Sequence, residues 1–389
     1  MPTMHVATSV ALAFTAMATN CGATAAANIV WHEAKEYGPA MLHGKAAYST
    51  GEQTSAYYSR LPSSAEQQTR PSIWSLSNQP AGTFLQFATN SSTIILNYTL
   101  GSSALSMWHF PSTGVSGADL YCYDEGNSSW RWVATTDPAY PVTSTVLVPA
   151  DAHTSTGETR RYRLHLPTYN EVKDDLVLGI DEDSVLVPDN STLIGFGDNE
   201  AIVWYGSSIL QGGVASRPGQ IATHQVTRRL GRLIYNFGFS GNCWMETSVA
   251  QYLVNITPAP ALFIIDCNPN MIGFPAAGSV PDIYSRTVPL VDYIRSHGHA
   301  TTPIILSEGT TYGSEWLSTV ARAGQVNKSA ALHEAFVNLT SGSVVGLPAC
   351  GSLWHQSLCR NADPFVAVAG ALQTSICTTQ KVLAFLATA

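Results

Sequence analysis

The second half of the sequence alternates short apolar runs with segments of helical spacing, and this alternation restricts the possible folds more than any other feature. The apolar runs have strand length, and the segments between them place apolar residues three or four positions apart. The expected strands cover residues 201–205, 233–237, 261–265, 303–306 and 343–347, and the expected helices cover residues 224–233, 245–254, 280–296, 321–339 and 365–372. This order predicts βαβ units, and near-continuous apolar strands predict a sheet covered on both faces. We therefore expect a three-layer α/β domain with a parallel sheet.

The preceding part of the chain has a different pattern. Short apolar or alternating runs recur between turn residues, at residues 83–87, 92–98, 130–133, 144–148, 161–166 and 176–180. Glycine, proline, serine and threonine interrupt every stretch that could form a long helix. The pattern predicts an all-β sandwich or jelly roll. A polar, proline-containing segment at residues 187–191 marks the expected border, giving a β domain at residues 28–190 and an α/β domain at residues 191–389.

The first 27 residues resemble a secretory leader. Residues 6–18 are apolar and residues 23–27 are small, as signal peptidase requires, although no lysine or arginine precedes them. Seven Asn-x-Ser/Thr sequons follow, at Asn90, Asn97, Asn127, Asn190, Asn255, Asn327 and Asn338. We interpret residues 1–27 as a signal peptide and expect an N-glycosylated protein that is secreted or resides in the secretory lumen.

Cysteine usage fits that compartment. Without Cys21 of the leader, six cysteines remain, at positions 122, 243, 267, 350, 359 and 377. An even number favours disulfides. Cys243 with Cys267 and Cys350 with Cys359 are candidate pairs, and the spacings do not resemble a zinc site.

Charge and hydropathy narrow the possible partners. The chain has 19 lysines and arginines against 27 aspartates and glutamates, a net charge of −8, which argues against nucleic acid or an anionic membrane surface. The body of the chain contains no run of eighteen apolar residues, so no membrane span is expected.

Three polar motifs follow three successive expected strands. They are Gly206-Ser207-Ser208, the stretch from Asn236 to Asn242, and the stretch from Asp266 to Met271. A strand that ends at Gly-x-Ser and turns toward a helix holds a hydroxyl at the carboxyl edge of the sheet. Open α/β sheets bind their ligands at that edge.

The order and spacing of these motifs resemble the SGNH (GDSL-type) hydrolases. In that family the corresponding blocks supply a nucleophilic serine, an oxyanion-hole glycine and an oxyanion-hole asparagine, which correspond here to Ser208, Gly241 and Asn270. The resemblance extends to the subfamily with an N-terminal β domain that carries a Gly-x-Asp-Leu-Tyr motif, present here at residues 117–121. Residues 59–62 and 164–170 also resemble that β domain.

The resemblance implies metal-free ester hydrolysis without a cofactor. Ser208 would attack the acyl carbonyl, and its own N–H, that of Gly241 and the amide of Asn270 would stabilise the oxyanion. Taken singly, Gly241 is also explained as a turn glycine and Asn270 as a helix N-cap. Ser207 replaces the commonest aspartate, which this subfamily tolerates.

The C-terminal part departs from the family pattern. The family carries an Asp-x-x-His-Pro block that supplies a general base and the carboxylate that orients it. The best-fitting segment here, residues 360–364, places Arg360 at the aspartate and Asp363 at the histidine, and the nearest histidine is His355. Three hypotheses follow. His355 acts as base with Asp363 orienting it; or Asp363 acts alone as a poorly matched base; or hydrolysis is lost and the fold binds a carbohydrate or an ester.

Four further residues have alternative interpretations. Arg217 is a candidate contact for a substrate carboxylate or sugar hydroxyl, and equally a surface ion pair. Trp108, Trp130 and Trp132 would form a sugar platform or, more commonly for such residues, belong to the sandwich core. The sequence as a whole predicts a secreted serine esterase acting on a small-molecule or carbohydrate ester, with acetyl esters of carbohydrate as one expectation. The alternative is a catalytically impaired binding module on the same scaffold.

Overall fold

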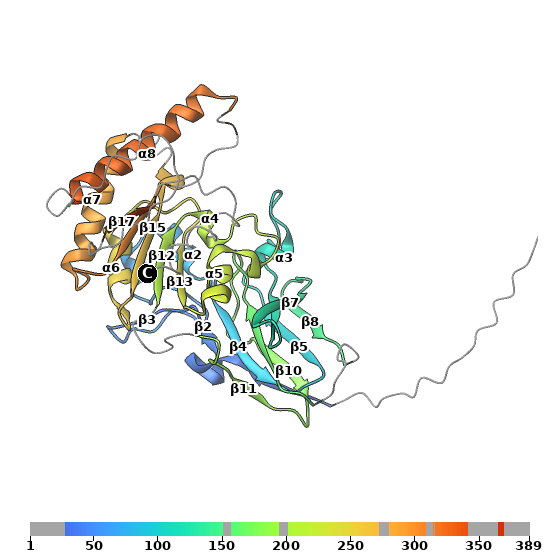
Figure 1. Cartoon of the computed structure of the whole chain (residues 1–389). Helices are drawn as coiled ribbons and strands as arrows, with labels where there is room; N and C mark the ends of the chain where they lie inside the picture. The colour runs from blue at the N-terminus through green and yellow to red at the C-terminus, as the bar shows by residue number, and fades with distance from the viewer. Residues whose placement is uncertain are drawn as a thin grey trace, which may run out of the picture.

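The structure is a computed structural model, and it describes residues 28–150, 157–193, 201–271, 280–308, 314, 316–340 and 365–368. An antiparallel β domain packs beside an α/β domain, as Figure 1 shows. The predicted order of a β domain followed by an α/β domain is therefore correct.

Two antiparallel sheets build the β domain. A four-stranded sheet has the order β1 (Ile29–Glu33), β10 (Val177–Asp181), β5 (Ile94–Thr99) and β8 (Val142–Val148). A six-stranded sheet has the order β11 (Leu186–Pro188), β4 (Phe84–Thr89), β9 (Arg160–His165), β6 (Asp119–Asp124) and β7 (Ser129–Thr135), with β2 (Leu42–His43) also paired to β4. Strand β5 buries alternate residues, as expected for a strand with one face in the core. All six residues of β4 are buried, so both faces of that strand are covered.

Short helices also occur in the β domain, where the sequence analysis expected none. They are η1 (Ala34–Ala40), α1 (Ala65–Gln68), α2 (Pro71–Ser77) and α3 (Ser112–Val115). Pro71 begins α2, at the position where its missing N–H costs no hydrogen bond. Helices this short have too few turns to show an apolar period, which is why the sequence did not reveal them.

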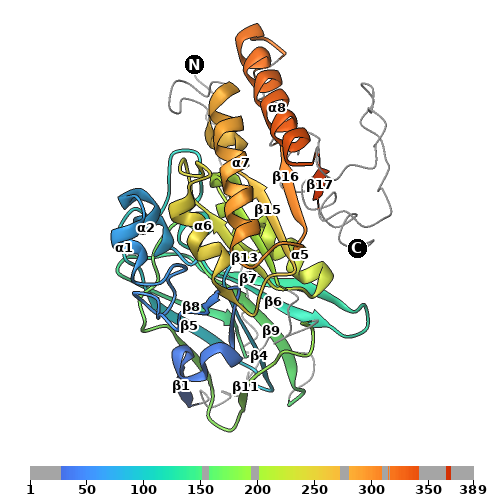
Figure 2. The same ribbon diagram turned by 90° about the vertical axis from the view of Figure 1, so that its left-hand side faces the viewer.

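The α/β domain contains a five-stranded parallel sheet. Its order is β13 (Ile234–Gly238), β12 (Ile202–Gly206), β15 (Leu262–Asp266), β16 (Ile304–Ser307) and β17 (Phe365–Val368). Alternate residues of β12 enter two different cores: Val203 and Tyr205 pack on the side of α6 (Thr247–Val254), α7 (Val280–Ser296) and α8 (Thr319–Thr340), whereas Ile202 and Trp204 pack toward α5 (Ala222–Leu230). Figure 2 shows α6 and α7 over one face of the sheet.

Strand β17 corrects one sequence prediction. Residues 365–372 were expected to begin a helix, but Phe365–Val368 pair in parallel with Ile304–Ser307. A short apolar segment does not distinguish a buried strand from a helix, and here the edge of β16 supplies the deciding hydrogen bonds. The strand predicted at residues 343–347 lies outside the described residues.

A small two-stranded sheet connects the domains. Strand β14 (Ile256–Thr257) of the α/β domain pairs antiparallel with β3 (Ala47–Tyr48) of the β domain. The Ser49 N–H also donates to the Asn255 carbonyl at 2.7 Å. These backbone bonds fix the two domains relative to each other. Within the described part of the chain, no helix is both long and apolar enough to cross a membrane.

Candidate active site

Ser208 lies two residues after β12, an inner strand of the parallel sheet that is paired on both sides. Strand β12 ends at Gly206, and Ser208 opens the short helix α4 (Ser208–Gln211). The Ser207 hydroxyl caps this helix by accepting from the Ile209 N–H at 3.3 Å. Gly212 ends it in the left-handed conformation, with φ of 115°, which glycine adopts without strain. The turn leaves the Ser208 side chain half-buried at the carboxyl edge of the sheet.

Strand register brings the three predicted motifs to this edge. Gly206 pairs with Gly238 of β13 on one side and with Asp266 of β15 on the other. Neighbouring parallel strands that end in register deliver the residues after them to the same place. Ser208, Gly241 and Asn270 follow these three strand ends by two, three and four residues, respectively.

The side-chain amide of Asn270 is oriented by one hydrogen bond. Its Oδ1 accepts from the Cys243 N–H at 3.1 Å, which leaves the NH₂ group as a donor. Asn270 lies inside η3 (Asn268–Met271), so the alternative reading of an N-cap does not apply. No described residue accepts a hydrogen bond from that NH₂ group or from the N–H groups of Ser208 and Gly241. Within the described part of the chain, three donors are thus left for a ligand.

A disulfide joins the loops that carry Gly241 and Asn270. Cys243 and Cys267 are bonded, with their Cα atoms 4.9 Å apart, as the sequence suggested. Cys122 is a half-buried free thiol that has no disulfide partner within the described ranges. Cys350, Cys359 and Cys377 lie outside the described residues.

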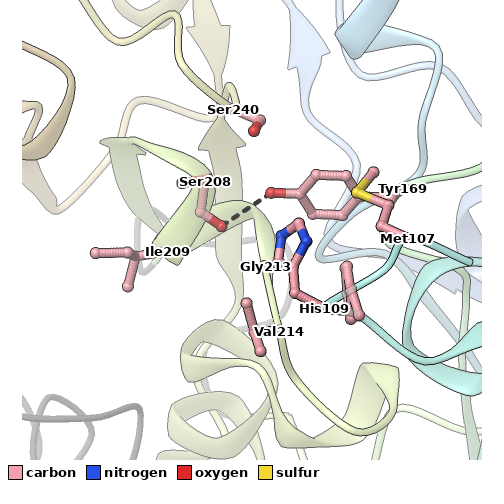
Figure 3. A pocket seen from close by; sticks show the side chains of 9 residues that line it. Met107, His109, Tyr169, Ser208, Ile209, Gly213, Val214 and Ser240 are labelled. Atoms are coloured by element: carbon pink, nitrogen blue, oxygen red, sulfur yellow. Dashed lines mark hydrogen bonds between the residues drawn. The ribbon is translucent and has the colours of Figure 1, made fainter.

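A pocket of about 250 Å³ opens beside Ser208 (Figure 3). Its lining comes from both domains: Met107, His109, Phe110 and Tyr169 from the β domain, and Ser208, Ile209, Gly213, Val214 and Ser240 from the α/β domain. The Tyr169 hydroxyl donates to the Ser208 carbonyl at 3.2 Å, and burial raises the pKa of this phenol to about 12. Tyr169 is therefore a neutral donor that ties the β domain to the nucleophile turn.

Two family models match the chain, one in its N-terminal part and one in its C-terminal part. The N-terminal domain of SGNH-hydrolase-type esterases, defined by its GxDLY motif, matches residues 29–186. The GDSL-like lipase/acylhydrolase family matches residues 199–352. The chain belongs to the SGNH/GDSL hydrolase family, in the group with a GxDLY domain. This confirms the resemblance drawn from the motifs.

Solved structures of similar shape share the two-domain arrangement. A protein from Bacteroides ovatus described as a GDSL-like lipase is 27% identical, with a TM-score of 0.72 over 88% of this chain and 87% of that one. The salicylyl-acyltransferase SsfX3 of a tetracycline biosynthetic pathway is 14% identical, with a TM-score of 0.57 over 85% and 83%. A family two carbohydrate esterase from Clostridium thermocellum is 11% identical, with a TM-score of 0.51 over 79% and 92%. The last two show the fold alone. No curated protein matches the sequence.

Several residues that the sequence analysis did not single out hold this SGNH/GDSL site together. Gln211 Oε1 accepts from the Ser240 N–H at 2.9 Å, while its Nε2 donates to Thr168 O at 3.1 Å and to Gln79 Oε1 at 2.5 Å. One side chain thus connects the nucleophile helix, the loop before Gly241 and the β domain. Its partners lie 29, 43 and 132 residues away in sequence, so no local pattern could have identified it.

Arg60 performs a similar task at the end of β13. This buried guanidinium donates to the carbonyls of Asn236 at 2.8 Å and Gly238 at 2.9 Å, and also to Leu76 O and Gln79 O. The motif at residues 59–62 marked this region as typical of the family but did not indicate its partners. Arg60 fixes the strand end from which the Gly241 loop starts.

The GxDLY motif also connects the domains. Asp119 is fully buried and accepts from the Gly219 N–H at 3.0 Å and the Trp132 Nε1–H at 2.8 Å. Arg217 Nε lies 3.3 Å from Asp119 Oδ2. Arg217 therefore forms an interdomain ion pair, which differs from both the substrate contact and the surface ion pair considered for it.

Other predicted residues have mixed outcomes. His355 and Asp363 lie outside the described residues, so both stay predictions. None of the three tryptophans belongs to a hydrophobic core: Trp108 is 96% exposed, Trp132 is 51% exposed, and Trp130 is half-buried. The expected core role is wrong for all three. Trp108 stands in solvent, and Trp130 and Trp132 of β7 lie against the guanidinium groups of Arg163 and Arg217.

Proposed function

We propose that this chain is a serine esterase that hydrolyses carboxylic esters through an acyl-Ser208 intermediate. The observation that supports it most is the common register of β12, β13 and β15. This register brings the Ser208 hydroxyl and the loops that carry Gly241 and Asn270 to the same carboxyl edge of the sheet. Ser208 Oγ would bond to the carbonyl carbon while its proton passes to a base. The displaced electron pair on the carbonyl oxygen would be stabilised by the donors at Ser208, Gly241 and Asn270. The tetrahedral intermediate then expels the alcohol, which takes from the base the proton that Ser208 gave up. Water next attacks the acyl-enzyme, which releases the carboxylic acid and restores the Ser208 hydroxyl.

The general base is proposed from the sequence and from the pocket. His355 with Asp363 as its orienting carboxylate is the sequence-based candidate. His109 is added because its imidazole lines the pocket that contains Ser208 (Figure 3). Histidine is the side chain most often used as a general base.

The compartment is part of the proposal. We propose that residues 1–27 are removed on secretion and that the protein carries N-glycans. Asn127, Asn327 and Asn338 are exposed sequon asparagines and suit this modification. Digestion with peptide N-glycosidase F should increase the electrophoretic mobility of the secreted protein; unchanged mobility would contradict the glycan assignment.

Hydrolysis of p-nitrophenyl acetate tests the activity. The wild-type protein should turn over the ester, and Ser208→Ala should lose at least a thousandfold in kcat/KM. His355→Ala and His109→Gln then identify the base, because the variant that lacks it loses activity to a similar extent. Equal rates for wild type and Ser208→Ala would refute the proposal. Ester or glycan binding without turnover would support the alternative of a binding module.

A further inference from the structure

We propose that the pocket beside Ser208 binds the acyl group of the substrate, and that this group is a short apolar chain longer than acetyl. The inference rests on the proposed esterase function and specifies its substrate class. It is carried by the chemistry of the pocket wall and by the position of the pocket relative to the oxyanion donors.

The pocket wall is built for an apolar group. Met107, Phe110, Ile209 and Val214 contribute hydrocarbon and thioether surface, and Tyr169 contributes its ring. None of the nine described lining residues carries a carboxylate, a guanidinium or a side-chain amide. The polar side-chain groups of the wall are the His109 imidazole and the hydroxyls of Ser208, Ser240 and Tyr169. These are too few to pair the several hydroxyls of a sugar, and each buried hydroxyl left unpaired costs about 1–3 kcal/mol. An alkyl chain needs no such partner.

The wall on the side of the β domain is already ordered. Met107 and Phe110 exchange two backbone hydrogen bonds, at 2.9 and 3.0 Å, which close a tight turn. Phe110 is 2% exposed and packs edge-on against Tyr169, with ring centroids 5.2 Å apart. The bond from the Tyr169 hydroxyl to the Ser208 carbonyl then fixes that ring beside the nucleophile. Preorganised walls reduce the entropy cost of holding a ligand.

The opposite wall holds its side chain in an unusual backbone conformation. Val214 has φ of 68°, a region that β-branched residues rarely occupy. Gly213, immediately before it, lies so close that a Cβ atom there would stand 3.0 Å from both Tyr169 Oη and Ser208 O. A glycine at position 213 therefore allows the Val214 side chain to approach the pocket from the nucleophile turn.

The position of the pocket assigns it to one part of the ester. Gly241 and Asn270, the oxyanion donors, are not among the lining residues. With the carbonyl oxygen on those donors, the pocket receives another substituent of the carbonyl carbon. The other two substituents of that carbon are the acyl chain and the alcohol part of the ester. The acyl chain matches an apolar wall, whereas the alcohol must leave for solvent. About 250 Å³ is the space of roughly eight water molecules at about 30 Å³ each, enough for a few methylenes but not for a long lipid chain.

Chain-length dependence tests the inference. For p-nitrophenyl acetate, butyrate and hexanoate, each corrected for its uncatalysed rate, kcat/KM should rise about fourfold per methylene until the pocket is full. The dodecanoate should be hydrolysed more slowly than the hexanoate. Val214→Trp and, independently, Met107→Trp should lower the hexanoate-to-acetate ratio of kcat/KM at least tenfold.

Trp108→Ala is the matched control. Trp108 belongs to the same turn but does not line the pocket, so this variant should keep the ratio within twofold. A wild-type protein that prefers acetate, or pocket variants that lower all esters equally, would overturn the inference.

A binding arm separates this inference from the proposed activity. Ser208→Ala should bind p-nitrophenyl hexanoate at least tenfold more tightly than p-nitrophenyl acetate in calorimetry, and Val214→Trp should remove the difference. Such binding without turnover by the wild type would support the acyl pocket and refute the esterase. Turnover without chain preference would refute the pocket alone. If neither turnover nor chain-length-dependent binding is found, both the esterase and the acyl pocket are refuted.

Discussion

At the scale of single residues, the site depends on N–H donors that have no acceptor among the described residues. Asn270 is held by its bond to the Cys243 N–H, and the Cys243–Cys267 disulfide holds that N–H in turn. The Asn270 side-chain amide is therefore held in one orientation, with its NH₂ group as the free donor. A donor fixed in advance stabilises a developing negative charge at no further reorganisation cost.

Replacing Asn270 tests this arrangement. Asn270→Ala should lower kcat by about 10²–10³, equivalent to roughly 3–4 kcal/mol, with a smaller effect on KM. Steady-state kinetics on p-nitrophenyl esters measures both values, and the melting temperature checks that the fold persists. An unchanged kcat would show that the asparagine does not contact the oxyanion.

The sequence identified these reacting groups better than it identified their supports. Ser208, Gly241 and Asn270 belong to local motifs at strand ends, and such motifs are readable from one sequence. Gln211, Arg60 and His109 reach the site only through tertiary contacts, with partners up to 176 or 178 residues away in the case of Arg60. A single sequence carries no signal for such pairs.

At the scale of elements, strand β6 with its GxDLY motif acts as the connector between the domains. Gly117 precedes the strand where a Cβ atom would lie 2.5 Å from the Thr113 carbonyl oxygen, so glycine is required there. The Asp119 carboxylate is desolvated, and burial raises its pKa to about 6. Its hydrogen bonds to Gly219, Trp132 and Thr135 and the ion pair with Arg217 compensate for this burial.

Removal of this carboxylate should destabilise the molecule. Asp119→Ala leaves the Gly219 N–H, the Trp132 N–H and the Arg217 guanidinium without their acceptor, so we expect a loss of about 3–5 kcal/mol in the free energy of unfolding. Urea denaturation at pH 7.5 measures it. Asp183→Ala, at an exposed position of the same domain, is the control and should change stability little. A similar effect of both substitutions would exclude the proposed role of Asp119.

The strands were also unequally predictable. β12, β13, β15 and β16 are continuous apolar runs buried on both faces, and their expected positions agree with the structure within two residues. The sequence does not predict β6, because residues 119–124 show no alternation of apolar and polar side chains. The sequence predicts a helix at residues 365–372, where β17 lies instead, because an apolar segment of this length fits either element.

At the scale of the whole molecule, the contact between the domains buries a cluster of basic side chains. His165 of β9 and His224 of α5 have ring centroids 4.0 Å apart, and the Phe84 ring of β4 packs edge-on against both. Arg228 donates to His165 Nε2 at 3.0 Å, so His165 must accept there and is neutral. Burial, together with the charges of Arg228 and Arg163, lowers the pKa of both imidazoles well below its usual value.

These histidines should make stability depend on pH. Below about pH 6.5 the unfolded chain protonates His224 while the folded chain does not, so the free energy of unfolding falls as pH decreases. His224→Gln removes this term, and its stability should therefore rise relative to the wild type by about 2 kcal/mol on going from pH 7.5 to pH 5. Asp119 and Asp266 act with the opposite sign, because burial raises their pKa to about 6, but they are common to both proteins.

Urea denaturation of the two proteins at several pH values provides the measurement. Between pH 7.5 and 8.5 His224 is unprotonated in both the folded and the unfolded state. The difference in the free energy of unfolding between wild type and His224→Gln should therefore be constant there. A difference that stays constant down to pH 5 would show that His224 takes up its proton in the folded state.

Covalent labelling of Ser208 tests the central claim most directly. A fluorophosphonate probe reacts with a serine hydroxyl only where the hydroxyl is activated and the phosphoryl oxygen meets fixed donors. Peptide mass spectrometry of the treated wild-type protein should locate one adduct on Ser208, formed at a rate that falls at least tenfold in Asn270→Ala. No adduct on Ser208, or labelling that Asn270→Ala leaves unchanged, would contradict the account.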